Sequence, residues 1–161
     1  MTFDPLGALR VLTEHEVEFV VIGGVAAAAH GSPSVTIDLD VCYSRDLENL
    51  VRLADALKSI NARLREVSED VPFILDSRTL EAGGIFTFTT DLGDLDCIGT
   101  PSGTRGYKDL AAGATQVDFD GLRVAVASVE DLIRMKRASA RPKDLVEMEI
   151  LGALRDEIDG F

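Results

Sequence analysis

The chain has 161 residues, of which 46% are hydrophobic and 27% are charged, and its formal net charge is −12. This length indicates one domain with a sizeable core. The negative charge excludes a protein whose whole surface grips nucleic acid. No apolar run approaches the roughly 20 residues of a membrane span, so we expect a cytoplasmic protein with no membrane partner. Cys42 and Cys97 lie in apolar runs and are expected to be buried free thiols.

The first predicted elements are a helix, a strand and a second helix. Residues 5–15 carry apolar residues at helical spacing and follow Asp4, a capping residue. Residues 17–22 form a β-branched apolar run that predicts a buried strand. The glycines at 23–24 end this strand, and the alanine-rich run at 25–29 predicts a short helix.

A second strand is predicted over residues 35–43, and it carries two aspartates. Because successive side chains of a strand point to opposite faces, Asp38 and Asp40 share one face. Neighbouring carboxylates repel one another, and a divalent cation, which prefers oxygen ligands, removes that repulsion. The alternative is a pair of solvated aspartates at the end of a strand.

The middle of the chain is predicted to form one long helix followed by strands. Apolar residues recur at helical spacing over residues 46–64. A short strand is expected over residues 73–75. Two further strands, over residues 85–90 and 94–98, are separated by a tight glycine-containing turn and predict a hairpin.

A second pair of aspartates, Asp94 and Asp96, shares one face of the last of these strands. If this strand lies beside the strand of Asp38 and Asp40, three or four carboxylates converge. Such a cluster is unfavourable unless a metal ion binds it. The alternative is that Asp94 and Asp96 are edge charges that keep the hairpin from pairing with other chains.

The C-terminal third is predicted to contain a hairpin over residues 117–126 and two helices. Ser128 and Asp131 form a capping box that opens a helix to about residue 138, and a second helix begins near residue 141. The whole pattern predicts a mixed β-sheet flanked by helices, of the α+β or α/β class, with a C-terminal helical segment.

A basic block covers residues 134–143, which include five basic residues and no acidic one: Arg134, Lys136, Arg137, Arg141 and Lys143. One interpretation is that Lys136, Arg141 and Lys143 reach a phosphate or an RNA. The other is a solvated helix face whose cations offset nearby acids.

The order of these pieces resembles the polymerase-β-type nucleotidyltransferase superfamily. The signature is Gly23–Gly24, then 13 residues, then Asp38-Leu39-Asp40-Val41 and a later Leu95-Asp96-Cys97. Residues 31–40 and 130–144 resemble, more specifically, the small AbiEii-type nucleotidyltransferases of bacterial toxin–antitoxin and phage-defence systems. The resemblance covers most of the chain, so it implies one nucleotidyltransferase-like domain over residues 1–161.

The resemblance implies an enzyme that moves a nucleoside monophosphate from an NTP, such as ATP, to a hydroxyl group. The acceptor would be an RNA, such as a tRNA end, or a protein, and a cognate toxin or antitoxin would be a partner. Two Mg²⁺ ions, with Mn²⁺ as an alternative, would clamp the attacking and leaving oxygens. The implied metal-binding and catalytic residues are Asp38, Asp40 and Asp96, and the implied nucleotide-binding residues are Gly23, Gly24, Thr36 and Lys136.

The sequence departs from its relatives just before the first aspartate. Ser34 and Ile37 stand where relatives often carry basic residues. This departure, with the acidic composition, supports a second hypothesis: an inactive binding module on a nucleotidyltransferase fold that neutralises or scaffolds a partner protein.

Overall fold

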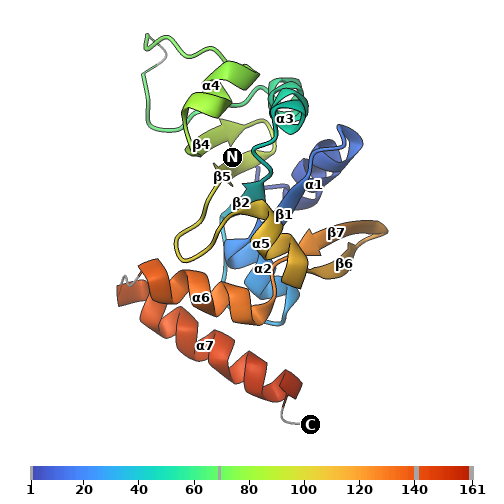
Figure 1. Cartoon of the computed structure of the whole chain (residues 1–161), viewed down its shortest axis with the longest axis vertical. Helices are drawn as coiled ribbons and strands as arrows, with labels where there is room; N and C mark the ends of the chain where they lie inside the picture. The colour runs from blue at the N-terminus through green and yellow to red at the C-terminus, as the bar shows by residue number, and fades with distance from the viewer. Residues whose placement is uncertain (1, 69, 140–141, 160–161) are drawn as a thin grey trace.

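The computed structural model describes residues 2–68, 70–139 and 142–159 (Figure 1). Its helices are α1 (Pro5–Glu14), α2 (Gly23–Ala29), α3 (Leu47–Ser59), α4 (Ser77–Ala82), α5 (Tyr107–Gly113), α6 (Val129–Ser139) and α7 (Pro142–Asp159). Its strands are β1 (Phe19–Ile22), β2 (Asp38–Tyr43), β3 (Arg63–Leu64), β4 (Ile85–Thr90), β5 (Gly93–Ile98), β6 (Thr115–Phe119) and β7 (Leu122–Val126).

Across the described residues, seven strands form one sheet in the order β3-β4-β5-β2-β1-β7-β6. The β4–β5 and β6–β7 hairpins are antiparallel, as is the β1–β2 pair, whereas β2 pairs with β5 and β1 with β7 in parallel. The sheet is therefore mixed, and the α+β class predicted from the sequence is confirmed. The parallel β2–β5 pair brings the two aspartate-bearing strands side by side.

One face of β2 and β5 is part of the hydrophobic core. Leu39 lies opposite Leu95 and Val41 lies opposite Cys97, and all four side chains are buried. Phe88 of β4, opposite Leu95, extends the same buried layer. Each of these residues alternates with a polar neighbour, as expected where one side of a sheet is covered by helices.

The opposite face of β2 and β5 carries Asp38, Asp40, Asp94 and Asp96, and we call it the acid face. Asp38 lies opposite Asp94, and Asp40 lies opposite Asp96. The convergence of the two strands is thus set by strand register, with the carboxylates on the side away from the core.

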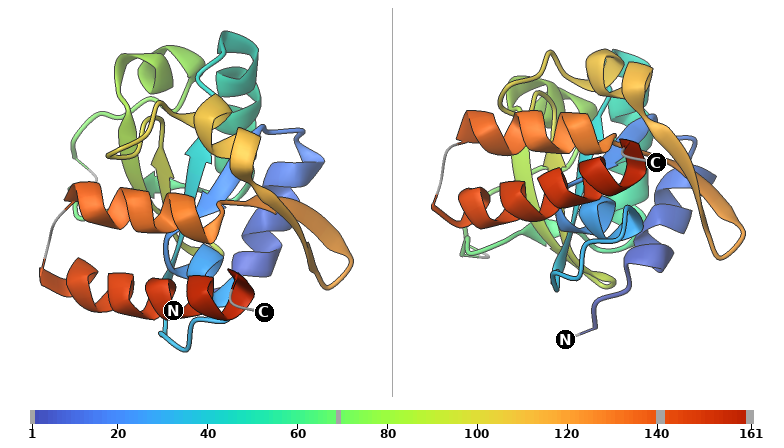
Figure 2. Two further views of the ribbon diagram at one scale, coloured as in Figure 1. Left: turned by 60° about the horizontal axis from the view of Figure 1, so that its bottom comes forward. Right: turned by 90° about the horizontal axis from the view of Figure 1, so that it is seen from below.

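Helices α3 and α4 lie together near β4, and α6 and α7 lie at the opposite end of the molecule (Figure 1). The short helix α2 packs on β1 and β2, and α6 contacts both α2 and α7. Helices α6 and α7 run side by side in both views of Figure 2 and form the expected C-terminal helical segment. None of the helices in the described part of the chain is both long and apolar enough to cross a membrane.

Three predictions about the extent or existence of an element are wrong. The helix expected over 46–64 ends at Ser59, because Asn61 adopts a positive φ of 53° and the chain then enters β3. No strand forms over 73–75, where Phe73 packs its ring against Phe86 and Phe88 instead.

The third concerns the strand expected over 35–43. It begins only at Asp38, the first residue that pairs with β5. The preceding side chains are not part of the core, and Ile37 is 75% exposed.

Local signals at helix starts and in the core are confirmed. The Gly7 amide donates to the Asp4 carboxylate at the start of α1, and the Asp131 amide donates to the Ser128 hydroxyl at the start of α6. Cys42 and Cys97 are free buried thiols. Burial raises the pKa of Cys42 to about 12, so its thiolate is not available at neutral pH.

Candidate active site

Three carboxylates meet on the acid face. Asp38, Asp40 and Asp96 each offer an oxygen, and these three oxygens lie within 4.8 Å of one another. Asp38 and Asp40 are two residues apart on β2, and Asp96 is brought in by the parallel register with β5. Among the described residues, this is the one group of three or more potential ligands with that spacing.

The electrostatics of this cluster are unfavourable without a cation. The pKa of Asp40 is raised from an ordinary value of 3.8 to about 7. Burial is the largest cause, and the negative charges of Asp38 and Asp96 act in the same direction. The positive charge of Lys136 acts in the opposite direction and lowers this pKa. Asp40 is therefore the group in the cluster that most needs a nearby positive charge.

The glycine pair lies directly against the second strand. Gly23 is the first residue of α2 and adopts a φ of +68°, and a Cβ atom at this position would overlap the Asp40 carboxylate. A Cβ atom at Gly24 would lie 2.7 Å from the Cβ of Thr36. Glycine is required here by close packing as well as by backbone conformation.

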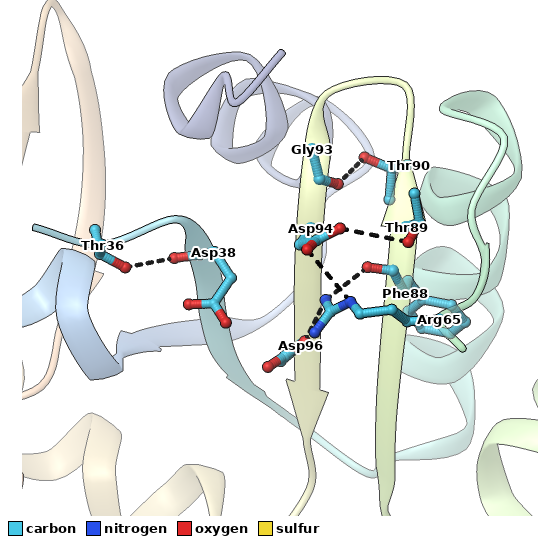
Figure 3. A network of polar contacts seen from close by, with 9 residues as sticks. All are labelled: Thr36, Asp38, Arg65, Phe88, Thr89, Thr90, Gly93, Asp94 and Asp96. Atoms are coloured by element: carbon cyan, nitrogen blue, oxygen red, sulfur yellow. Dashed lines mark hydrogen bonds and ion pairs between the residues drawn. The ribbon is translucent and has the colours of Figure 1, made fainter. Parts of the chain in front are cut away.

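Thr36 fixes the approach to β2. Its hydroxyl donates to the carbonyl oxygen of Asp38 at 3.0 Å (Figure 3). This contact orders the first residue of the aspartate strand. Contact of Thr36 with a phosphate stays a prediction, as do the nucleotide-binding roles of Gly23 and Gly24.

Lys136 connects α6 with both the acid cluster and α7. Its ammonium lies 3.3 Å from a carboxylate oxygen of Asp144, which is fully buried and accepts a 2.6 Å hydrogen bond from the Ser139 hydroxyl. Asp144, in the first turn of α7, therefore anchors the lysine. The influence of Lys136 on Asp40 places it on the site side of α6.

The rest of the basic block is partly neutralised within the chain. Arg134 pairs with Asp109 and with Asp131, both at 3.1 Å. Arg137 is exposed, whereas Arg141 and the side chain of Lys143 lie outside the described residues. Arg134 and Lys136 therefore each pair with acids of the same chain, and contact of Lys136 with a phosphate stays a prediction.

Asp94 faces away from the three-carboxylate cluster. It ion-pairs with Arg65 at 3.4 Å and accepts a hydrogen bond from the Thr89 hydroxyl (Figure 3). The same guanidinium donates to Asp96 at 2.7 Å. Sequence reasoning missed Arg65, because it is 31 residues from Asp96 and no motif marks it.

A cavity of about 210 Å³ opens beside the cluster. Gly23, Asp40 and Lys136 line one part of it, apolar side chains that include Ile98, Met135 and Leu151 line another, and polar residues such as Ser102 and Glu147 complete the lining. The site thus combines a charged corner with an apolar wall, which is the usual composition of a pocket for a small organic ligand.

The donor set fits a hard divalent cation. Three carboxylates supply only oxygen ligands, which hard divalent cations prefer, and a cation among them would offset the mutual repulsion of the three charges. Asp38, Asp40 and Asp96 are the residues that would hold such an ion.

This sheet, with two aspartates on one strand and a third on its parallel neighbour, has the fold of solved nucleotidyltransferases. No family model and no curated protein sequence matches the chain. Solved structures do match it across nearly its whole length, and those described below carry nucleotidyltransferase names.

The lincomycin-bound lincosamide antibiotic adenylyltransferase LnuA is similar with a TM-score of 0.61 and 10% identity, over 92% of this chain and 94% of that one. A Thermotoga maritima protein assigned as a nucleotidyltransferase gives a TM-score of 0.51 at 18% identity, over 99% and 98%. ANT(2'')-Ia in complex with adenylyl-2''-tobramycin gives 0.54 at 15% identity, over 94% of each chain. These structural similarities, at such low sequence identities, show the fold of the chain.

Proposed function

We propose that this protein is a metal-dependent nucleotidyltransferase, which moves a nucleoside monophosphate from an NTP to a hydroxyl group and releases pyrophosphate. The observation that carries the proposal is the convergence of Asp38, Asp40 and Asp96 within 4.8 Å on the acid face. The nucleotidyltransferase fold of the solved relatives supports it. Residues 1–161 would act as one domain.

Asp38, Asp40 and Asp96 would hold two Mg²⁺ ions, or Mn²⁺ in their place. When bound, such ions neutralise charge on the transferring phosphoryl group and orient it. As the resemblance implies, Asp96 would also accept the proton of the attacking hydroxyl.

The nucleotide phosphates would bind at the corner formed by β1 and α2. The main-chain amides of Gly23 and Gly24, two residues that carry no side chain of their own, would donate to phosphate oxygens. Lys136 would add a positive charge from α6, held in place by Asp144. Thr36 would keep β2 in register and contact a phosphate. The apolar wall of the adjoining cavity suits the base of the nucleotide.

Two lines of support bear on the acceptor, and they favour different classes of molecule. The resemblance to AbiEii-type enzymes favours a hydroxyl on RNA or on a partner protein, in a toxin–antitoxin or phage-defence setting. The solved relatives favour a small molecule, since LnuA is bound to lincomycin and ANT(2'')-Ia to an adenylylated tobramycin. The net charge of −12 counts against a long RNA contact.

Transfer of label is the test. The chain is incubated with each α-³²P-labelled NTP and Mg²⁺, together with total RNA, a protein extract, a lincosamide or an aminoglycoside. Wild type should label one of these acceptor classes, and Asp38→Asn and Asp40→Asn should label none. Asp55→Asn, an identical change on the exposed side of α3, is the matched control and should retain activity. Absence of label from all four NTPs, in a folded protein that binds no divalent ion, refutes the proposal.

The second candidate is an inactive binding module. It is favoured by Ser34 and Ile37, which leave the entrance to β2 without a basic side chain. An inactive module would bind its partner equally well with Asp40 or Asn at position 40, whereas the enzyme would lose its function.

A further inference from the structure

Arg65 is fixed on the acid face by contacts from several directions (Figure 3). Its side chain is 22% exposed and its amide donates to the carbonyl oxygen of Thr87, which extends the β3–β4 pairing by one residue. One guanidinium nitrogen donates to the Phe88 carbonyl oxygen at 2.8 Å and to Asp96 at 2.7 Å. The Nε atom lies 3.4 Å from the Asp94 carboxylate.

Asp96 lies between this guanidinium and the other two carboxylates. Figure 3 shows Arg65 on the β4 side of Asp96 and Asp38 on its far side. Asp96 therefore contacts a positive charge with one oxygen and contributes to the three-carboxylate cluster on the opposite side. Without a partner behind it, a carboxylate that is 18% exposed and lies beside two others would rotate away from them, because like charges repel.

We infer that Arg65 is a positioning residue for the third carboxylate: its guanidinium holds Asp96 turned towards Asp38 and Asp40 so that the three together bind a divalent cation. Asp94 completes the arrangement, since it holds the other edge of the guanidinium. The inference rests on the proposed metal site and adds to it two residues, Arg65 and Asp94, that do not contact the ion.

The planar shape of the guanidinium matters as much as its charge. Arginine presents donors in a fixed plane, so the groups on β4 and β5 that it contacts fix its direction. A lysine carries the same charge on a single flexible ammonium and cannot contact Asp94, Asp96 and the Phe88 carbonyl together in the same way. Exchange of arginine for lysine therefore separates positioning from simple charge compensation.

The experiment measures Mn²⁺ binding to the full chain by electron paramagnetic resonance, with urea unfolding to confirm that each variant is folded. Arg65→Lys should weaken Mn²⁺ binding by about 10- to 100-fold, the range typical for loss of a group that orients a metal ligand. Arg65→Gln should weaken it as well, although the removal of a positive charge alone would strengthen cation binding. Asp94→Asn, which leaves Arg65 and Asp96 intact, should give a smaller loss in the same direction.

Arg63→Lys is the matched control, because Arg63 lies on β3 two residues earlier, is exposed, and donates a hydrogen bond to the Asn61 carbonyl oxygen. It should bind Mn²⁺ like wild type. Equal affinity in wild type, Arg65→Lys and Asp94→Asn overturns the inference and leaves the proposed function intact, as does tighter binding by Arg65→Gln. No Mn²⁺ binding by wild type overturns both.

Discussion

The most informative single substitution is Asp40→Asn, because it removes a carboxylate of the cluster whose ionisation the fold disfavours. The pKa of Asp40 is raised from 3.8 to about 7 by burial and by the charges of Asp38 and Asp96. Each pKa unit corresponds to about 1.4 kcal/mol, so ionised Asp40 costs the metal-free fold up to about 4 kcal/mol.

The sign of the pH dependence follows from proton binding. Between pH 4 and 7, folded Asp40 holds a proton that the unfolded chain has released. The contribution of Asp40 to stability is therefore greatest below about pH 4 and is lost as the pH rises through about 7. Asparagine does not titrate, so Asp40→Asn should be more stable than wild type by up to about 4 kcal/mol at pH 8, and the difference should shrink towards pH 4.

Urea unfolding in EDTA, from pH 4 to 8, measures this difference. Asp55→Asn, on the exposed side of α3, should follow the wild-type curve at every pH. Mg²⁺ at more than about 1,000 times its dissociation constant should reverse the order at pH 8, since wild type then gains more than about 4 kcal/mol of binding free energy and Asp40→Asn does not. A constant difference between wild type and Asp40→Asn across this pH range would refute the electrostatic reasoning.

Further predictions concern the same corner and one helix start. Gly23→Ala should destabilise the fold by more than Gly121→Ala when urea unfolding is compared; both glycines have positive φ, but only at Gly23 would the new methyl group overlap Asp40, whereas at Gly121 it meets open space. Lys136→Met should raise the pKa of Asp40 above its wild-type value, since the lysine charge lowers it. Carboxyl ¹³C titration by NMR measures this shift, and an unchanged pKa contradicts the charge interaction between Lys136 and Asp40. Ser128→Ala should cost about 1 kcal/mol of unfolding free energy in urea, through loss of the cap on α6, and no change would argue against that cap.

The sequence predicted the parts of the fold that depend on local chemistry. The β4–β5 turn, the β6–β7 hairpin and the Ser128 cap each depend on a few adjacent residues, and each forms as predicted. The long helix was extended too far because Ile60 and Leu64 continue its apolar spacing. The chain leaves the helix there for a tertiary reason, namely that Leu64 pairs with Phe88 on β4.

The candidate site divides in the same way. Alternation along each strand was enough to predict that Asp38 shares a face with Asp40 and that Asp94 shares a face with Asp96, and the parallel register of β2 and β5 then brings Asp38, Asp40 and Asp96 together. Arg65 and the Lys136–Asp144 pair could not be predicted, because each contact joins elements whose relative placement no local pattern fixes. The sequence did not decide whether Asp94 belongs to the carboxylate cluster. Its ion pair with Arg65 places it outside the cluster of Asp38, Asp40 and Asp96.

The central claim is that Asp38, Asp40 and Asp96 bind divalent metal next to a nucleotide at Gly23 and Gly24. A crystal of the full chain with Mn²⁺ and a non-hydrolysable NTP analogue, measured at a wavelength where manganese scatters anomalously, tests it directly. The account predicts an anomalous peak between these three carboxylates, with the triphosphate against the glycine amides. A bound nucleotide at another place, with no anomalous peak among the three aspartates, would contradict it.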